Sequence, residues 1–82
     1  MVHKLYSLYD RKMESFGPPT PSTNDAGVRR GILDAMRGGD SLLNRYPSDF
    51  DLYCVGLFDD ETGEIAQETP TPRLVCNCGE VS

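Results

Sequence analysis

The sequence has no long apolar segment. Its longest mostly apolar run, residues 52–58, is far shorter than the ~20 residues that a membrane-spanning helix needs. It also has no signal peptide and only three cysteines among 82 residues, which argues against a secreted domain held together by disulfides. We therefore expect a cytosolic protein that does not associate with a membrane.

Catalytic and metal-binding motifs are scarce as well. His3 is the only histidine, and no nucleophile elbow, phosphate-binding glycine loop or HExxH motif is present. Cys76 and Cys78 have the spacing of half a zinc site but lack a second pair of ligands, so we expect them to be reduced thiols in a C-terminal tail. We predict that the protein is not an enzyme and holds no metal or cofactor.

The chain is long enough for one domain but not for a large core. Ordering a chain costs roughly 1.5 kcal/mol per residue, and small domains barely offset this cost. The usual remedies are disulfides, a bound metal or self-association, and the sequence disfavours the first two. We therefore expect a homo-oligomer.

Charge is distributed unevenly along the chain. Residues 1–45 contain seven basic and five acidic residues, whereas residues 46–82 contain one basic and eight acidic residues. The first half thus carries a formal charge of +2 and the second half −7. This asymmetry favours a polyanionic partner for the basic half, although the net charge of −5 argues against tight, non-specific DNA binding by a monomer.

Three segments have the pattern of strands. Residues 2–9 are rich in apolar and aromatic side chains, and residues 52–58 form the strongest strand pattern in the chain. A polar turn over residues 59–63 leads to a weaker returning strand over residues 64–69, whose one strong apolar anchor, Ile65, is typical of an edge strand.

One amphipathic helix is expected between the strands. A proline-rich loop over residues 17–23 precedes it, Asn24 is its predicted N-cap, and Gly38-Gly39 is its predicted end. Its apolar stripe consists of Val28, Ile32, Ala35 and Met36. We therefore predict an α+β domain over residues 1–69, a small, mainly antiparallel sheet of three to four strands with one helix packed across it, followed by a loosely ordered tail over residues 70–82.

The candidate binding residues lie in the basic half. Cations that can contact phosphates, together with tyrosines on which bases can stack, are what single-stranded nucleic acid requires. The set comprises Arg11, Lys12, Arg29, Arg30, Arg37, Arg45, Tyr9 and Tyr46. In the alternative interpretation, the arginines form a solvated helix face and the aromatic residues belong to the core.

Residues 46–63 follow the pattern YPxDFxLYxVGxFDxxTG. With the N-terminal segment over residues 5–12, then Phe16 and the Asn24-Asp25 helix start, this layout resembles the small nonstructural protein of gokushovirus-type microviruses, which are single-stranded DNA phages. The resemblance covers about residues 3–66; the tail, the proline-rich loop and the Gly27/Gly31 pair in the helix depart from it.

The resemblance implies a phage-encoded protein of the host bacterial cytoplasm that is not a virion component. It also implies binding of single-stranded DNA during genome replication or packaging. Oligomers could combine several weakly basic surfaces on one side, which would let an acidic monomer bind a polyanion. The alternative is a regulator that docks on a phage or host replication protein through its acidic half.

Overall fold

The computed structural model describes residues 1–38, 41–67 and 72–80. Within these ranges the chain folds into an antiparallel sheet of six strands and one main helix. The strands are β1 (Val2–Asp10), β2 (Ser15–Phe16), β3 (Thr20–Ser22), β4 (Phe50–Asp59), β5 (Ile65–Ala66) and β6 (Arg73–Asn77). The helices are α1 (Asp25–Arg37), the short α2 (Leu42–Arg45) and the 3₁₀ turns η1 (Pro47–Asp49) and η2 (Cys78–Glu80). None of these helices is long and apolar enough to cross a membrane.

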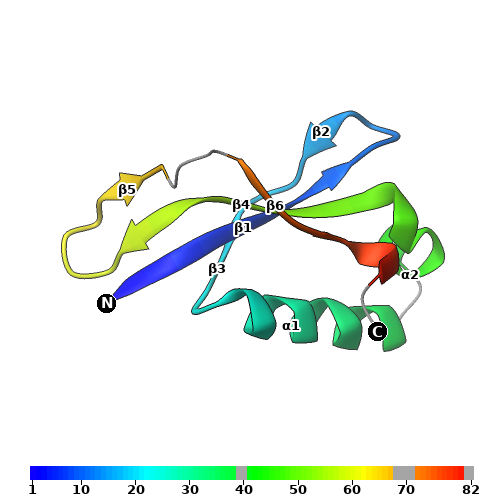
Figure 1. The fold of residues 1–82 in the computed structure, drawn as a ribbon, viewed down its shortest axis with the longest axis horizontal. Coiled ribbons are helices and arrows are strands. Elements are labelled where there is room, and N and C mark those ends of the chain that lie inside the picture. Colours follow the sequence, from blue (N-terminus) through cyan, green and yellow to red (C-terminus); the bar gives the residue numbers. More distant parts are fainter. Residues whose placement is uncertain (39–40, 68–71, 81–82) are drawn as a thin grey trace.

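Two long strands, β1 and β4, form the centre of the sheet (Figure 1). The short strands β2 and β3 both pair with β1, while β5 and β6 both pair with β4. A bulge in β4 opposite Leu5 and Tyr6 shifts the register between the two central strands. The four short strands therefore form the two edges of the sheet.

The α+β class is confirmed, but the predicted strand count was too low. The segments β2 and β3 span two and three residues, too few for the alternation that identifies a strand in sequence. Pro21 lies opposite Leu5 in β3, within the segment predicted as a loop. Proline is tolerated there because β3 is an edge strand.

The C-terminal segment, expected to be a loosely ordered tail, contributes β6 and η2 to the fold. Strand β6 pairs with β4 from Asp51 to Cys54, and Cys78 in η2 is completely buried. The expected returning strand over residues 64–69 is present as β5, which spans only Ile65–Ala66; residues 68 and 69 lie outside the described residues.

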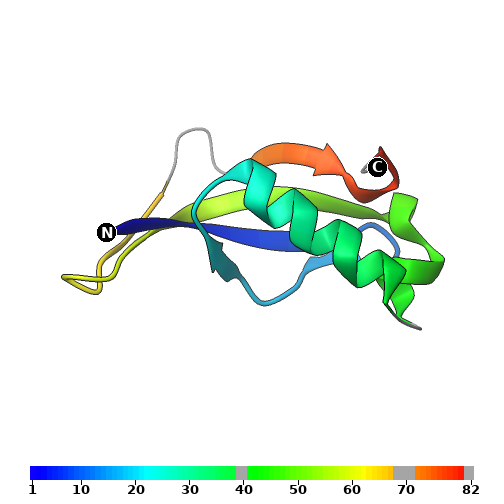
Figure 2. The same ribbon diagram turned by 90° about the horizontal axis from the view of Figure 1, so that it is seen from below.

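Helix α1 covers one face of the sheet (Figure 2). As predicted, Asn24 caps it, because its side-chain oxygen accepts a 2.7 Å hydrogen bond from the Gly27 amide. Ile32 is buried, and Val28 and Met36 pack against the core beside it. Ala35, predicted to lie on this stripe, is exposed. The stripe through which α1 packs against the core is therefore narrower than the sequence pattern suggested.

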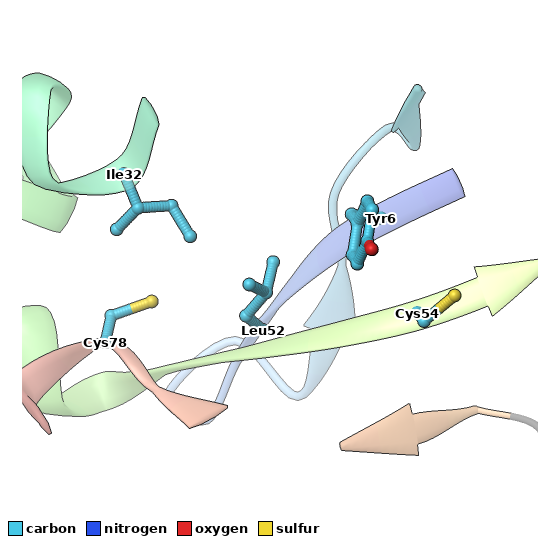
Figure 3. Close-up of a cluster of buried hydrophobic side chains, with 5 residues drawn as sticks. All are labelled: Tyr6, Ile32, Leu52, Cys54 and Cys78. Atoms are coloured by element: carbon cyan, nitrogen blue, oxygen red, sulfur yellow. The ribbon is translucent and has the colours of Figure 1, made fainter. Parts of the chain in front are cut away.

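The core lies between α1 and the sheet and is small (Figure 3). Its buried side chains are Tyr6, Ile32, Leu52, Cys54 and Cys78. Leu52 and Cys54 are two residues apart in β4, so they point to the same face, towards α1. Because side chains alternate along a strand, Tyr53 and Tyr9 point to the opposite face, where the described chain places no helix (Figure 1).

Candidate nucleic-acid interface

Three aromatic rings contact one another on the sheet face opposite α1. Tyr9 and Phe16 are direct partners across β1 and β2, and their ring centroids lie 4.8 Å apart. Tyr53 of β4 lies 6.3 Å from Tyr9 and 5.4 Å from Phe16, with its ring nearly perpendicular to that of Tyr9. Phe16 is 46% exposed, so part of this cluster is open to a ligand.

A rigidly held arginine lies beside the rings. Arg11 donates two hydrogen bonds, of 2.8 and 2.9 Å, to the carboxylate of Asp51, which lies opposite Tyr9 in the sheet. Asp51 is only 5% exposed, whereas the Arg11 side chain is 56% exposed. The guanidinium is therefore fixed in place on its inner side and open to solvent on its outer side.

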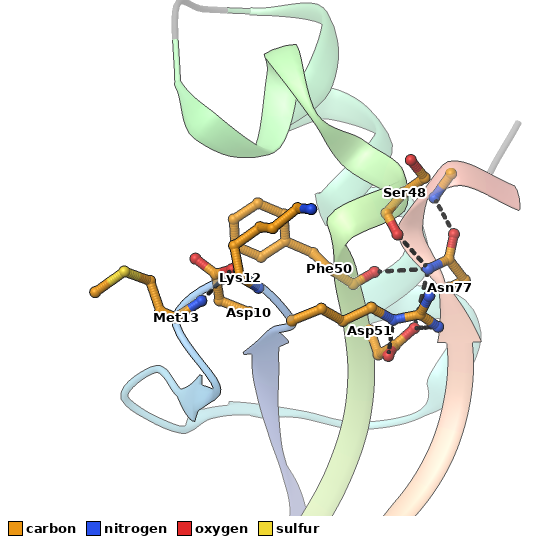
Figure 4. A network of polar contacts seen from close by, with 9 residues as sticks. Asp10, Lys12, Met13, Ser48, Phe50, Asp51 and Asn77 are labelled. Carbon is orange, nitrogen blue, oxygen red and sulfur yellow. Dashed lines mark hydrogen bonds and ion pairs between the residues drawn. The ribbon is translucent and has the colours of Figure 1, made fainter.

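A side-chain amide completes this arrangement (Figure 4). Asn77 donates a 2.9 Å hydrogen bond to Asp51 Oδ1 and others to the carbonyl oxygens of Ser48 and Phe50. The hydrogen bonds from Arg11, and then from Asn77, lower the pKa of the Asp51 carboxyl against the opposing effect of burial. Asp51 is thus a carboxylate at neutral pH. We call Tyr9, Phe16, Tyr53 and Arg11 the sheet-face site.

The turn between β1 and β2 brings a second cation to the same end of the molecule. Asp10 Oδ1 accepts hydrogen bonds from the amides of Lys12 and Met13, at 2.9 and 3.2 Å, and Glu14 has a positive φ of 54°. Lys12 is exposed and lines a hollow that also contains Tyr46. Two of its lining residues, Asp10 and Phe50, follow Tyr9 in β1 and precede Asp51 in β4, so alternation places them on the sheet face opposite the rings.

The helix arginines lie elsewhere. Arg29, Arg30 and Arg37 are all exposed on α1, which covers the face opposite the aromatic rings (Figure 2). Asp34 is also exposed and lies four residues after Arg30 and three before Arg37, so it shares their side of the helix and reduces the positive charge there. Arg45 is exposed in α2.

The predicted binding residues therefore do not form one surface. Tyr9 and Arg11 lie together on the open sheet face, Lys12 and Tyr46 line the hollow, and the helix arginines lie on the other side of the molecule. Sequence reasoning did not include Phe16 or Tyr53 in the site. Alternation along residues 50–59 would have placed Tyr53 opposite the core residues, but Phe16 required knowledge that residues 15 and 16 form a strand.

The cysteines belong to the fold rather than to a site. Cys78 was expected in a tail; it is instead in the core, and burial raises the pKa of its thiol to about 12. Burial also raises the pKa of Cys76. Among the residues that the structure describes, no group of histidine, cysteine and acidic side chains is arranged to hold a metal ion.

Fold and site together define a small α+β protein with an aromatic, arginine-bearing open sheet face. The profile of the family described as Phage ORF5 protein matches residues 3–81. "Protein ORF5" of Chlamydia phage 1 is 35% identical over 79 residues, covering 92% of this chain and 82% of that relative. No solved structure matches the chain.

The chain belongs to the Phage ORF5 protein family. This confirms the resemblance to the small nonstructural protein of gokushovirus-type microviruses. The match extends to residue 81, so it also includes the C-terminal segment that the sequence resemblance left out.

Proposed function

We propose that this phage protein binds single-stranded DNA on its open sheet face, in the cytoplasm of the infected host, during genome replication or packaging. The observation that carries the proposal is the cluster of three contacting rings beside Arg11. Proteins that bind single strands stack bases on aromatic side chains displayed on a sheet and contact the backbone with nearby cations.

Stacking is the main source of affinity in this proposal. Each base stacked on an aromatic side chain contributes about 1–3 kcal/mol, largely independently of base identity. Phe16 is the most accessible candidate because it is 46% exposed, while Tyr9 and Tyr53 are partly buried and hold its ring in place. The cluster is therefore preorganised before any base arrives.

Phosphate contacts contribute less. Arg11 is neutralised on one side by Asp51, and Lys12, which lines the hollow, is the second cation that we assign to the strand. Each phosphate contact with a single strand adds about 0.7 to the slope of log affinity against log salt, so two contacts give a slope of no more than about 1.4. The chain's net charge of −5 also opposes a strong electrostatic contribution. We expect modest affinity with weak salt dependence.

The test is a fluorescence anisotropy titration of a labelled single-stranded 15-mer at low and at moderate salt, with the same sequence as a duplex for comparison. Binding of the single strand in preference to the duplex, with a small salt slope, supports the proposal. No binding of the single strand even at low salt would overturn it, and docking on a replication protein would then become the leading proposal.

We also propose that the protein self-associates through the opposite edge of the same sheet face. Ile65 of β5 and Leu74 of β6 are 71% and 56% exposed, and their pairing with Phe58 and Tyr53 places both on this face. Burying them against a second copy would extend a small core. Sedimentation at tens of micromolar should show a dimer or larger that dissociates on changing both residues to serine; a species of 9.1 kDa would contradict this.

A further inference from the structure

A hollow of about 370 Å³ lies on the other side of the β1–β2 hairpin from the sheet-face site. Its volume is near the lower end of the range for small-molecule sites, ~300–1,000 Å³, which suits a single ring system. It is lined by Asp10, Lys12, Met13, Leu42, Tyr46, Asp49 and Phe50. Figure 4 shows Asp10, Lys12 and Met13 gathered near Phe50 at this end of the molecule.

We propose that the hollow holds one base of the same DNA strand and prefers a base that carries an exocyclic amino group. This inference rests on the proposed single-stranded DNA binding and adds a second subsite to it. Two consecutive cations, Arg11 and Lys12, lie at the end of the hairpin. Arg11 is held by Asp51 on the open sheet face, whereas Lys12 lines the hollow. A strand stacked on the sheet face can therefore pass the end of the hairpin with its phosphates next to both.

The walls of the hollow are mostly apolar or aromatic. Tyr46 is 53% exposed, so the face of its ring is accessible to a base, and Phe50 supplies a second aromatic surface in the lining. Met13 and Leu42, which are 71% and 59% exposed, add apolar surface that an inserted base would cover. Four of the seven lining residues are thus apolar or aromatic, as expected for a site that takes a flat ring.

Two aspartates, Asp10 and Asp49, line the hollow. Asp10 uses Oδ1 to hold the hairpin turn. The backbone amide of Asp49 donates a hydrogen bond to the Tyr46 carbonyl, and its backbone carbonyl accepts one from the Arg11 amide. Among the described residues, the Asp49 carboxylate has no hydrogen-bond partner. A carboxylate accepts a hydrogen bond from the amino group of cytosine, adenine or guanine, but thymine offers no such group. Lys12 lies in the same lining, where its ammonium can meet the phosphate.

The experiment compares labelled single-stranded decamers of cytosine and of thymine as probes for the full-length protein. We expect the cytosine strand to bind about fivefold more tightly, the gain typical of one additional hydrogen bond. The Asp49→Ala variant should remove this preference and leave thymine binding unchanged. Tyr46→Ala should weaken the cytosine strand, whereas Tyr46→Phe, which keeps the ring, should not.

Two further measurements make the outcomes distinct. Phe16→Ala, at the sheet-face site, should weaken both strands equally and keep their ratio, while Val2→Ala, at a 55% exposed position outside both subsites, should change neither. A cytosine decamer that carries one 5-iodocytosine should photo-crosslink to Tyr46 as well as to Phe16 or Tyr53. Equal binding of the two strands with no crosslink at Tyr46 would overturn the base subsite and leave the sheet-face proposal intact. No binding of either strand would overturn both.

Discussion

The Tyr6 hydroxyl donates a 2.5 Å hydrogen bond to Asp25 Oδ1, which joins the central strand β1 to the first turn of α1. Arg73 of β6 donates two hydrogen bonds of 3.2 Å to the same carboxylate. Three elements that are distant in sequence thus meet at one carboxylate. Because the described residues include only five buried apolar side chains, this junction is important for the position of α1.

Replacing Tyr6 by phenylalanine should lower the free energy of unfolding by about 1 kcal/mol, because the change removes one hydrogen bond and keeps the ring. Urea denaturation followed by circular dichroism measures the loss. Tyr46→Phe is the matched control, since Tyr46 is 53% exposed, and it should alter stability by less than about 0.5 kcal/mol. Equal effects of the two changes would show that the Tyr6–Asp25 contact contributes nothing.

Stability should fall in acid. The pKa of Asp25 is lowered from its ordinary value of 3.8, first by hydrogen bonds from Arg73 and then from Tyr6; that of Asp51 is lowered mainly by Arg11. Because both pKa values are lower in the folded state, the two groups contribute fully above about pH 5, and their contribution is lost as the pH falls through those lowered values.

Urea midpoints measured between about pH 7 and pH 3 test this linkage. Asp51→Asn should be less stable than wild type at neutral pH and should lose less stability on acidification. A variant curve parallel to that of wild type over the whole range would contradict the assignment of Asp51.

Long periodic segments were predictable from sequence, whereas short pairings were not. The strand over residues 52–58, the helix N-cap at Asn24 and the contact stripe through Ile32 follow from local patterns. The strands β2 and β3 are formed by pairing with β1 rather than by their own sequence, and β6 depends on contacts of Arg73 and Cys78 with distant elements. The strand conformation of these segments is set by tertiary contacts, which local sequence patterns do not reveal.

The same limit explains the candidate site. Residue type suggested Tyr9 and Arg11 as candidate binding residues, but only the fold shows that Arg11 is held by Asp51, 40 residues away in sequence. The predicted set also included the helix arginines beside Tyr9 and Arg11, because residue type does not show that α1 covers the other face of the sheet (Figure 2). Burial cannot be deduced from composition, and therefore Cys78 was assigned to a tail.

Cys78→Ser should destabilise the protein by about 1–3 kcal/mol, because a hydroxyl would be buried at a position with 0% exposure. Cys76→Ser should cost less, since Cys76 is only partly buried. Thermal unfolding under reducing conditions compares the two. Equal melting temperatures for Cys78→Ser and wild type would show that η2 is not held in the core.

Two glycines should respond to alanine in opposite ways. At Gly31, in the helix, an added Cβ meets no atom within 4 Å, so Gly31→Ala should stabilise by about 0.5–1 kcal/mol. At Gly56, beside the β4 bulge, the Cβ would lie 2.9 Å from the Ala66 carbonyl oxygen, so Gly56→Ala should destabilise the protein by displacing β5. Chemical denaturation measures the change in the free energy of unfolding for each variant. A stabilising Gly56→Ala would contradict the described packing of β5 on β4.

A triple variant of the helix arginines tests whether DNA binds to the open sheet face or to α1. Changing Arg29, Arg30 and Arg37 together to glutamine should leave both affinity and salt slope close to wild type, because these residues lie on the opposite side from the rings. Any unfolding would be visible by circular dichroism. A strong loss of affinity with a flatter salt slope would instead place phosphate contacts on α1.

The most direct test is the affinity of Phe16→Ala for a labelled single-stranded 15-mer, measured by anisotropy beside Val2→Ala as a control. Both side chains are exposed, at 46% and 55%, but Val2 belongs neither to the sheet-face site nor to the proposed self-association surface. Loss of one stacked base should weaken Phe16→Ala by about 1–3 kcal/mol with little change in salt slope, while Val2→Ala binds as wild type. Equal affinity of Phe16→Ala and wild type would contradict stacking on the open sheet face.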